Sequence, residues 1–215
     1  MSVDGKNGLP YSYWMGDDVI PDTLFKYDAA SPVQEFLESR KCFLSQYKMD
    51  GGILFSQWLA SYCCTYDVNT KLILATLQKE QSLISLKAEP DKRIMDRAMG
   101  FGMTDAGDMA EYYGFEQQVA NSIQWFRKQY DLAAAKLKSD SLLSVLVDEG
   151  FIKVNTVSIF TYISYKYTPW TGVPGSLFSR KHGRNHGVYL FWLIWKMYWP
   201  KDLDATRTSL PDFFA

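Results

Sequence analysis

The sequence predicts a mainly α-helical protein with a single helical domain. Apolar residues recur at helical spacing in successive segments, and residues typical of helix starts precede several of these segments. No internal repeat, low-complexity stretch or linker divides the chain. We expect residues 1–30 to form an irregular N-terminal arm, residues 31–199 to form the helical domain and residues 200–215 to form a C-terminal tail.

The first half of the chain predicts three helices. The first begins near Ser31, which we expect to be its N-cap, with Gln34 completing a capping box. A glycine pair at residues 51–52 ends this segment, and a second helix with apolar residues on one face follows it. Asn69 then caps a third helix, which we expect over residues 70–87.

The second half predicts a glycine-punctuated loop followed by further helices. The loop covers residues 99–107, and the helices are expected near residues 110–130, 141–150 and 155–167. The last of these segments is rich in Val, Ile, Thr and Tyr, which would also suit a β-strand. Asn185 is the expected cap of a final, aromatic helix.

Composition excludes several classes of function. The 215 residues carry a formal net charge of -1, which argues against a general nucleic-acid-binding protein. Three Cys and two His lack metal-ligand spacing, so we expect neither a metal site nor a cofactor. The most apolar stretch, residues 188–199, is too short to span a bilayer, so we expect a buried helix and no stable membrane insertion.

Glu80 occupies an unusual place in the third predicted helix. On a helical wheel it lies in the middle of an aliphatic sector. The sector consists of Ile73, Leu77 and Ile84, and the opposite face carries Lys71, Gln78 and Ser82. Burial there would favour the neutral acid and raise its pKa, as a glycosidase requires of its proton donor. The alternative is a structural glutamate that is paired with a Lys or Arg or accepts from backbone donors.

Four segments resemble the lysozyme-like muramidase domains, relatives of goose-type lysozymes and soluble lytic transglycosylases. The run LQKEQSLI, which contains Glu80, is similar to the catalytic helix of this family. The other segments are RAMGFG at 97–102, YYGFEQQV at 112–119 and YKYTP at 165–169. They occur in the order of the family and extend the resemblance over residues 31–199. The resemblance implies a lysozyme-like fold and cleavage of bacterial peptidoglycan.

The same resemblance implies roles for individual residues. Glu80 would be general acid and then general base, and Tyr167 would approach it with its hydroxyl. The residues implied to bind substrate are Ser82, Gly102, Met103, Gln118 and Thr168. For Gln118, a hydrogen bond at the edge of the core is an equally good interpretation, and a plain turn is the alternative for the glycines. Thr168 departs from the Asn that many transglycosylases carry at this place.

The reaction depends on a second carboxylate, for which the sequence offers Asp96, Asp105 and Asp108. Asp105 is the best of these candidates. Without a second acid, the resemblance suggests attack by the N-acetyl group of the substrate on the anomeric carbon. The product would form either by hydrolysis or by transfer to the muramic acid 6-hydroxyl, and we favour the lytic transglycosylase.

Two other interpretations remain at this point. One is a cell-wall-binding or virion structural protein that keeps the fold without the chemistry, and the other is a glycosidase acting on chitin-like polymers. The N-terminus lacks a basic segment followed by an apolar run, so we expect no secretory signal. We therefore expect synthesis in a host cytoplasm and action on the wall as a phage lysin or virion-associated enzyme, with virion or tail proteins as further partners.

Overall fold

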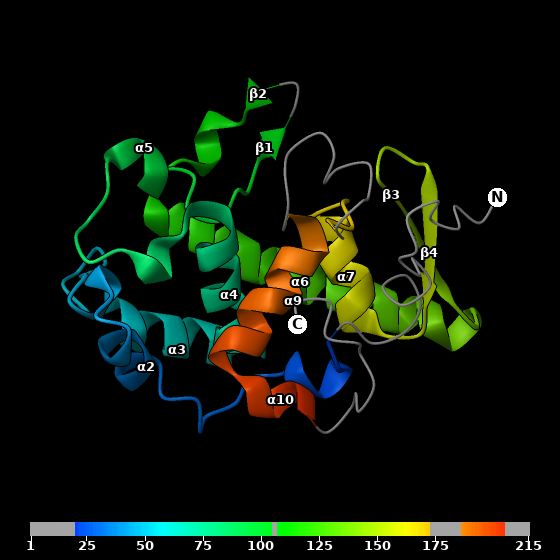
Figure 1. The fold of residues 1–215 in the computed structure, drawn as a ribbon, viewed down its shortest axis with the longest axis horizontal. Coiled ribbons are helices and arrows are strands. Elements are labelled where there is room, and N and C mark those ends of the chain that lie inside the picture. Colours follow the sequence, from blue (N-terminus) through cyan, green and yellow to red (C-terminus); the bar gives the residue numbers. More distant parts are fainter. Residues whose placement is uncertain (1–19, 105–106, 173–185, 205–215) are drawn as a thin grey trace, which may run out of the picture. The chain divides into compact units, whose positions relative to one another are not determined.

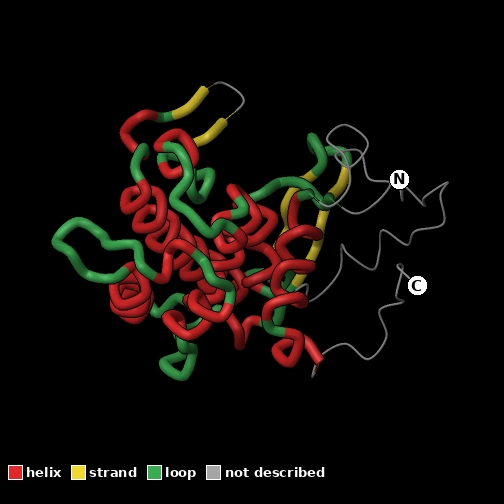
Figure 2. The backbone as a smooth tube through the Cα atoms, turned by 60° about the vertical axis from the view of Figure 1, so that its left-hand side comes forward, coloured by secondary structure: helices red, strands yellow, loops and turns green. Residues whose placement is uncertain are grey.

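Helices dominate the part of the chain that the structure describes, and the strands in that part form two short pairs (Figure 1). The structure is a computed structural model that describes residues 20–104, 107–172 and 186–204. Figure 2 shows the same balance, with eight α-helices among the described residues. The mainly α fold class predicted from the sequence is therefore confirmed.

The chain divides into two compact units. One consists of Phe25–Asp131, and the other consists of Met1–Leu24 together with Leu132–Ala215. The helices and strands of the first unit are α2 (Val33–Ser39), α3 (Phe55–Tyr66), α4 (Thr70–Gln81), α5 (Lys92–Met95), β1 (Met103–Thr104), β2 (Gly107–Asp108) and the start of α6 (Phe115–Ser139). The 3-10 turns η2 (Phe43–Ser45), η3 (Leu83–Ser85) and η4 (Ala110–Tyr112) connect them.

The predicted capping box at the start of α2 is wrong. Pro32 is the N-cap, and no side chain caps the helix. The Ser31 hydroxyl instead accepts a hydrogen bond from Thr70 Oγ1 at 3.3 Å. The Gln34 amide donates to the carbonyl of Ser45 at 3.1 Å. These side chains satisfy partners that follow them in the sequence by many residues, and such partners cannot be read from local spacing.

The second unit contains the later elements. They are η1 (Asp22–Leu24), the end of α6, β3 (Leu143–Val147), β4 (Ile152–Thr156), α7 (Ile159–Tyr167), α9 (Gly187–Tyr198) and α10 (Pro200–Asp204). The aromatic helix α9 buries Val188, Phe191 and Trp195 among others, as the sequence predicted. Among the described residues, no helix has the length and apolarity needed to cross a bilayer. The cap predicted at Asn185 lies outside the described residues.

The helix predicted over residues 141–150 is wrong, because these residues form β3 and the turn of a β-hairpin. β3 and β4 pair in antiparallel register, with Val145 opposite Val154. The turn between them has positive φ at Asp148, Glu149 and Gly150, which reverses the chain. Valines at alternate positions of β3 favour the strand, since β-branched side chains pack well on a pleated surface.

The helix predicted over residues 155–167 is confirmed in its second part only. Residues 155 and 156 end β4, and α7 begins at Ile159 after the N-cap Ser158, whose hydroxyl accepts from the amide of Thr161 at 3.1 Å. Asp22 supports this start: its carboxylate accepts from the amides of Ile159 at 3.0 Å and Phe160 at 2.8 Å. Helix N-termini favour negative charge, so Asp22 fixes the start of α7.

Candidate functional site

Helix α4 places Glu80 in its last turn. Asn69 is the N-cap, as predicted, and its side chain accepts from the amide of Lys71 at 2.9 Å. The helix was predicted to continue to residue 87, but it ends at Gln81 because Ser82 adopts a left-handed conformation with φ of 57°. Ser82 is exposed in this turn and does not lie on a helical face opposite Glu80.

The surroundings of Glu80 are partly apolar and partly open. Ile73 and Leu77 on α4 have no exposed surface, and Ile84 is buried but lies in η3, beyond the end of the helix, so the predicted aliphatic sector is confirmed only in its α4 part. The Glu80 side chain itself keeps 24% of its surface exposed. The burial expected for Glu80 is therefore only partial, because the helix ends beside this residue.

Gly100 lies directly against the Glu80 carboxyl group. A Cβ atom at residue 100 would be 3.0 Å from Oε2 and 3.2 Å from Cδ of Glu80. The φ angle of Gly100 is +70°, in the region that favours glycine. Two properties of glycine are thus used at once, its backbone freedom and its lack of a side chain. The glycine-rich loop predicted from the sequence does pass beside the predicted acid.

Lys79 contacts the other oxygen of the same carboxylate. Its ammonium forms an ion pair with Glu80 Oε1, and the Lys79 side chain is only 8% exposed, which is unusual for lysine. The ion pair matches the structural alternative that the sequence left open for Glu80. The carboxyl group is thereby oriented, with Oε1 toward Lys79 and Oε2 toward Gly100.

Gln118 holds the glycine loop in place. It is completely buried on α6, and its Oε1 accepts from the amides of Met99 at 3.2 Å and Phe101 at 3.0 Å. Its Nε2 donates to the carbonyls of Phe101 at 2.9 Å and Tyr112 at 2.7 Å. These four hydrogen bonds use the full capacity of the amide. Of the two interpretations offered by the sequence, the structure places Gln118 in the hydrogen bonding of the core.

Gly102 and Met103 lie further along the same loop. A Cβ atom at Gly102 would be 2.5 Å from Cδ2 of Tyr112, so this glycine makes room for the tyrosine ring. The ring in turn packs edge-on against Phe101, with centroids 4.9 Å apart. Met103 begins β1 and is partly exposed. Asp105, the preferred second carboxylate, lies outside the described residues.

The other two carboxylates considered for this loop are bound in ion pairs. Asp96 accepts from the ammonium of Lys92 at 2.6 Å. Asp108, in β2, accepts from Arg97 Nε at 2.7 Å, and this guanidinium holds the pKa of Asp108 below its usual range. Arg97 also lies over the ring of Tyr113, 5.1 Å from its centroid. The ion pair between Arg97 and Asp108 joins the start of the loop to β2.

Tyr167 and Thr168 belong to the other compact unit. Tyr167 is the last residue of α7, and Thr168 is its C-cap, whose amide donates to the carbonyl of Ser164 at 3.0 Å. Both side chains are partly exposed. The roles that the resemblance implies for them, beside the acid and the substrate, stay predictions.

Sequence reasoning missed a buried carboxylate, Asp148. It has no exposed surface, and its two oxygens accept from the amide and the hydroxyl of Thr171, each at 2.7 Å. Burial raises the pKa of Asp148, while the hydrogen bonds from Thr171 act in the opposite direction. The mistaken helix over residues 141–150 concealed this residue, because it placed Asp148 near a helix end instead of in a hairpin turn.

Among the described residues, no group of three or more His, Cys, Asp or Glu side chains is arranged to hold a metal ion. No protein-family model, curated protein sequence or solved structure matches the chain.

Proposed function

We propose that this chain is a peptidoglycan-degrading glycosidase that cleaves the β-1,4 bond between N-acetylmuramic acid and N-acetylglucosamine, with Glu80 as its acid and base. The observation that carries the proposal is the contact between the Glu80 carboxyl group and Gly100. A partly exposed carboxylate meets bare backbone there, and Gln118 holds that backbone in position. The resemblance to lysozyme-like domains supplies the substrate, and it also supports a lysozyme-like fold.

The chemistry requires Glu80 to carry a proton first and to accept one later. The protonated carboxyl group gives its proton to the glycosidic oxygen as the bond to the anomeric carbon breaks. In the route that needs no second carboxylate, the N-acetyl oxygen of the substrate attacks that carbon and forms a cyclic intermediate. Glu80, now ionised, takes a proton from water or from the muramic acid 6-hydroxyl as that oxygen opens the intermediate. We favour the 6-hydroxyl, which makes the enzyme a lytic transglycosylase.

Lys79 orients the carboxyl group of Glu80. Its ammonium forms an ion pair with Oε1. Oε2 lies on the side of the glycine loop, where the substrate would approach it. In this arrangement Lys79 is a positioning residue and makes no contact with the substrate.

The test is the substitution Glu80→Gln, which removes the transferable proton and keeps the volume. We expect cleavage of purified sacculi to fall by roughly 10²–10⁴-fold, the usual contribution of a general acid. Glu35→Gln, a matched change at an exposed glutamate of α2, should leave the rate unchanged. Mass analysis of the wild-type products separates the two reactions, because only the transglycosylase leaves 1,6-anhydro ends. Cleavage by Glu80→Gln at the wild-type rate would refute the proposal.

The ion pair between Lys79 and Glu80 favours a second candidate. A glutamate paired in this way also suits a wall-binding or virion structural protein that lacks catalysis. This candidate predicts that the wild-type protein binds sacculi and releases no fragments. Under either candidate we propose that the chain acts at the bacterial cell wall as a phage lysin or a virion-associated protein.

A further inference from the structure

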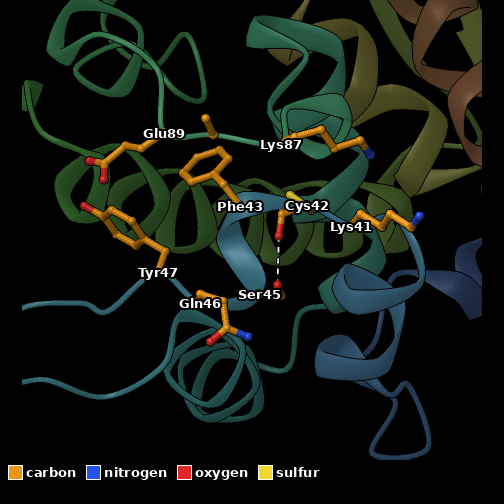
Figure 3. Close-up of a pocket in the computed structure, with 9 residues that line it drawn as sticks. Lys41, Cys42, Phe43, Ser45, Gln46, Tyr47, Lys87 and Glu89 are labelled. Carbon is orange, nitrogen blue, oxygen red and sulfur yellow. Dashed lines mark hydrogen bonds between the residues drawn. The ribbon is translucent and has the colours of Figure 1, made fainter.

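A surface pocket lies in the unit Phe25–Asp131, separate from the residues that surround Glu80. Its volume is about 440 Å³, within the usual range for small-ligand sites of roughly 300–1,000 Å³. Residues 41–43 and 45–47, from the segment that includes η2, and residues 87–89 line it (Figure 3). Nothing in the proposed reaction uses this pocket.

Hydrogen bonds join the two segments that form the pocket. The amide of Phe43 donates to the carbonyl of Leu86 at 3.0 Å, and the buried thiol of Cys42 donates to the carbonyl of Leu83 at 3.3 Å. Within the first segment, the hydroxyl of Ser45 donates to the carbonyl of Cys42 at 2.8 Å (Figure 3). The walls are therefore formed before any ligand arrives, which lowers the entropic cost of binding.

Charges of opposite sign lie at the two ends of the pocket. Figure 3 shows Lys41 and Lys87 on one side, Glu89 and Tyr47 on the other, and the ring of Phe43 between them. Within the described part of the chain, the side chains of Lys41 and Glu89 form no hydrogen bond or ion pair, whereas the Lys87 ammonium donates to the carbonyl of Arg40. Burial, and secondly the charge of Glu89, raise the pKa of the Tyr47 hydroxyl, consistent with a carboxylate facing this ring.

We propose that this pocket binds a short peptide that carries both a free carboxylate and a free amine. The carboxylate would lie beside Lys41 and Lys87, the amine beside Glu89, and the carbon chain between them over Phe43. Glu89 opposes polyanions such as nucleic acid, so the pair of lysines is not a general phosphate site. If the proposed function holds, the natural ligand is the stem peptide of peptidoglycan, which carries carboxylates and, in many walls, an amine.

The test is calorimetric titration of the full chain with the synthetic tetrapeptide L-Ala-γ-D-Glu-L-Lys-D-Ala. We expect the peptide to bind, and the affinity to fall at least about tenfold when its carboxylates are amidated or its amines are acetylated. Amidation removes the negative charge that faces the two lysines, and acetylation removes the positive charge that faces Glu89. Lys41→Gln should weaken binding of the unmodified peptide at least about threefold and should not change binding of the amidated peptide. Glu89→Gln should weaken binding of the unmodified peptide at least about threefold and should not change binding of the acetylated peptide.

Two variants outside the pocket provide matched controls. Lys48→Gln and Glu35→Gln remove the same charges at other exposed positions and should leave the affinity unchanged. The inference is overturned if the tetrapeptide does not bind, or if Lys41→Gln and Lys48→Gln weaken it equally. Equal binding of the blocked and unblocked peptides would overturn it as well.

A second measurement separates this inference from the proposed function. Glycan strands stripped of their peptides by an amidase offer the enzyme its scissile bond without the pocket's ligand. The wild type and Lys41→Gln should cleave these strands equally, while Lys41→Gln should raise KM on peptide-bearing strands. Peptide binding without any cleavage would refute the glycosidase and keep the pocket. Cleavage without peptide binding would refute the pocket alone.

Discussion

Asp148 and Glu80, one in each compact unit, are carboxylates that differ in their exposure and in their contacts. Asp148 has no exposed surface, and Thr171 satisfies both of its oxygens. Glu80 keeps a quarter of its side-chain surface exposed, and one of its oxygens lies against the bare backbone of Gly100. Burial is thus greater at the residue whose role is structural. The feature that fits a proton donor is a carboxyl group that is partly exposed to solvent.

The largest expected difference between the two carboxylates concerns stability. Asp148→Ala leaves the buried amide and hydroxyl of Thr171 without acceptors and should cost about 2–4 kcal/mol. Glu80→Ala removes a partly exposed side chain and the ion pair of Glu80 with Lys79, and it should cost less than Asp148→Ala, about 1–2 kcal/mol. Unfolding by urea, followed by circular dichroism, measures both values. Equal losses would contradict the assignment of a structural role to Asp148 and a functional one to Glu80.

Gly100→Ala tests the contact between Gly100 and the carboxyl group of Glu80. The alanine must adopt φ of +70°, and its Cβ would lie 3.0 Å from Oε2, so we expect a cost of about 1–2 kcal/mol and a loss of activity of at least about tenfold. Gly51→Ala is the matched control, because Gly51 has φ of +89° and a Cβ atom there would meet nothing within 4 Å. It should cost a similar amount of stability and leave the cleavage of sacculi unchanged. Equal activity of the two variants would argue against a role for this contact.

Thr171→Val tests the buried acid through pH. The pKa of Asp148 is raised in the folded protein. Its carboxyl group therefore contributes most to stability at pH values below the ordinary pKa of an aspartate. This contribution is lost as the pH rises through the pKa of the folded state. The Thr171 hydroxyl opposes this loss by stabilising the ionised form. Its removal should cost about 1 kcal/mol at pH 7 and less at pH 4.

Urea unfolding at the two pH values measures the effect of Thr171→Val, and Thr65→Val provides the comparison. The Thr65 hydroxyl donates to a carbonyl on the exposed surface of α3, so its loss should show no such dependence on pH. A larger loss at pH 4 than at pH 7 for Thr171→Val would contradict the interpretation.

The smallest effect is expected at the ion pair that joins the loop to β2. Arg97→Gln removes the partner that lowers the pKa of Asp108, so the stability it contributes is present above the ordinary pKa of Asp108 and is lost as pH falls. The thermal midpoint should fall slightly at pH 7, and the difference should vanish near pH 2 or in 1 M salt. An unchanged difference under both conditions would show that Arg97 acts through packing over Tyr113 instead.

The sequence predicted those features that depend on local spacing. The cap at Asn69, the aliphatic sector of α4 and the glycine loop after residue 98 all follow from side chains a few residues apart. The sequence did not predict the end of α4 at Gln81, since Ser82 in a left-handed conformation has no strong signal of its own. It missed the β3–β4 hairpin because LLSVLV suits a helix and a strand almost equally.

The candidate site was predictable only in part for a related reason. Glu80 and Gly100 stood out as residue types in a pattern, but their contact depends on how the loop returns to the end of α4. Gln118 was expected at the edge of the core, yet its four hydrogen bonds to residues 99–112 depend on tertiary structure. Lys79 was overlooked because adjacent helical residues normally point apart.

The most direct measurement of the central claim compares two leaving groups with Glu80→Gln. Cleavage of glycan strands needs a proton on the departing sugar oxygen. A dinitrophenyl β-glycoside of N-acetylmuramic acid releases dinitrophenolate, which leaves without a proton. If Glu80 donates that proton, Glu80→Gln should lose roughly 10²–10⁴-fold on strands and less than about tenfold in the first-turnover release of dinitrophenolate, which precedes the step that needs Glu80 as the base. Equal losses on both substrates, or no loss on either, would contradict the assignment of Glu80 as the acid.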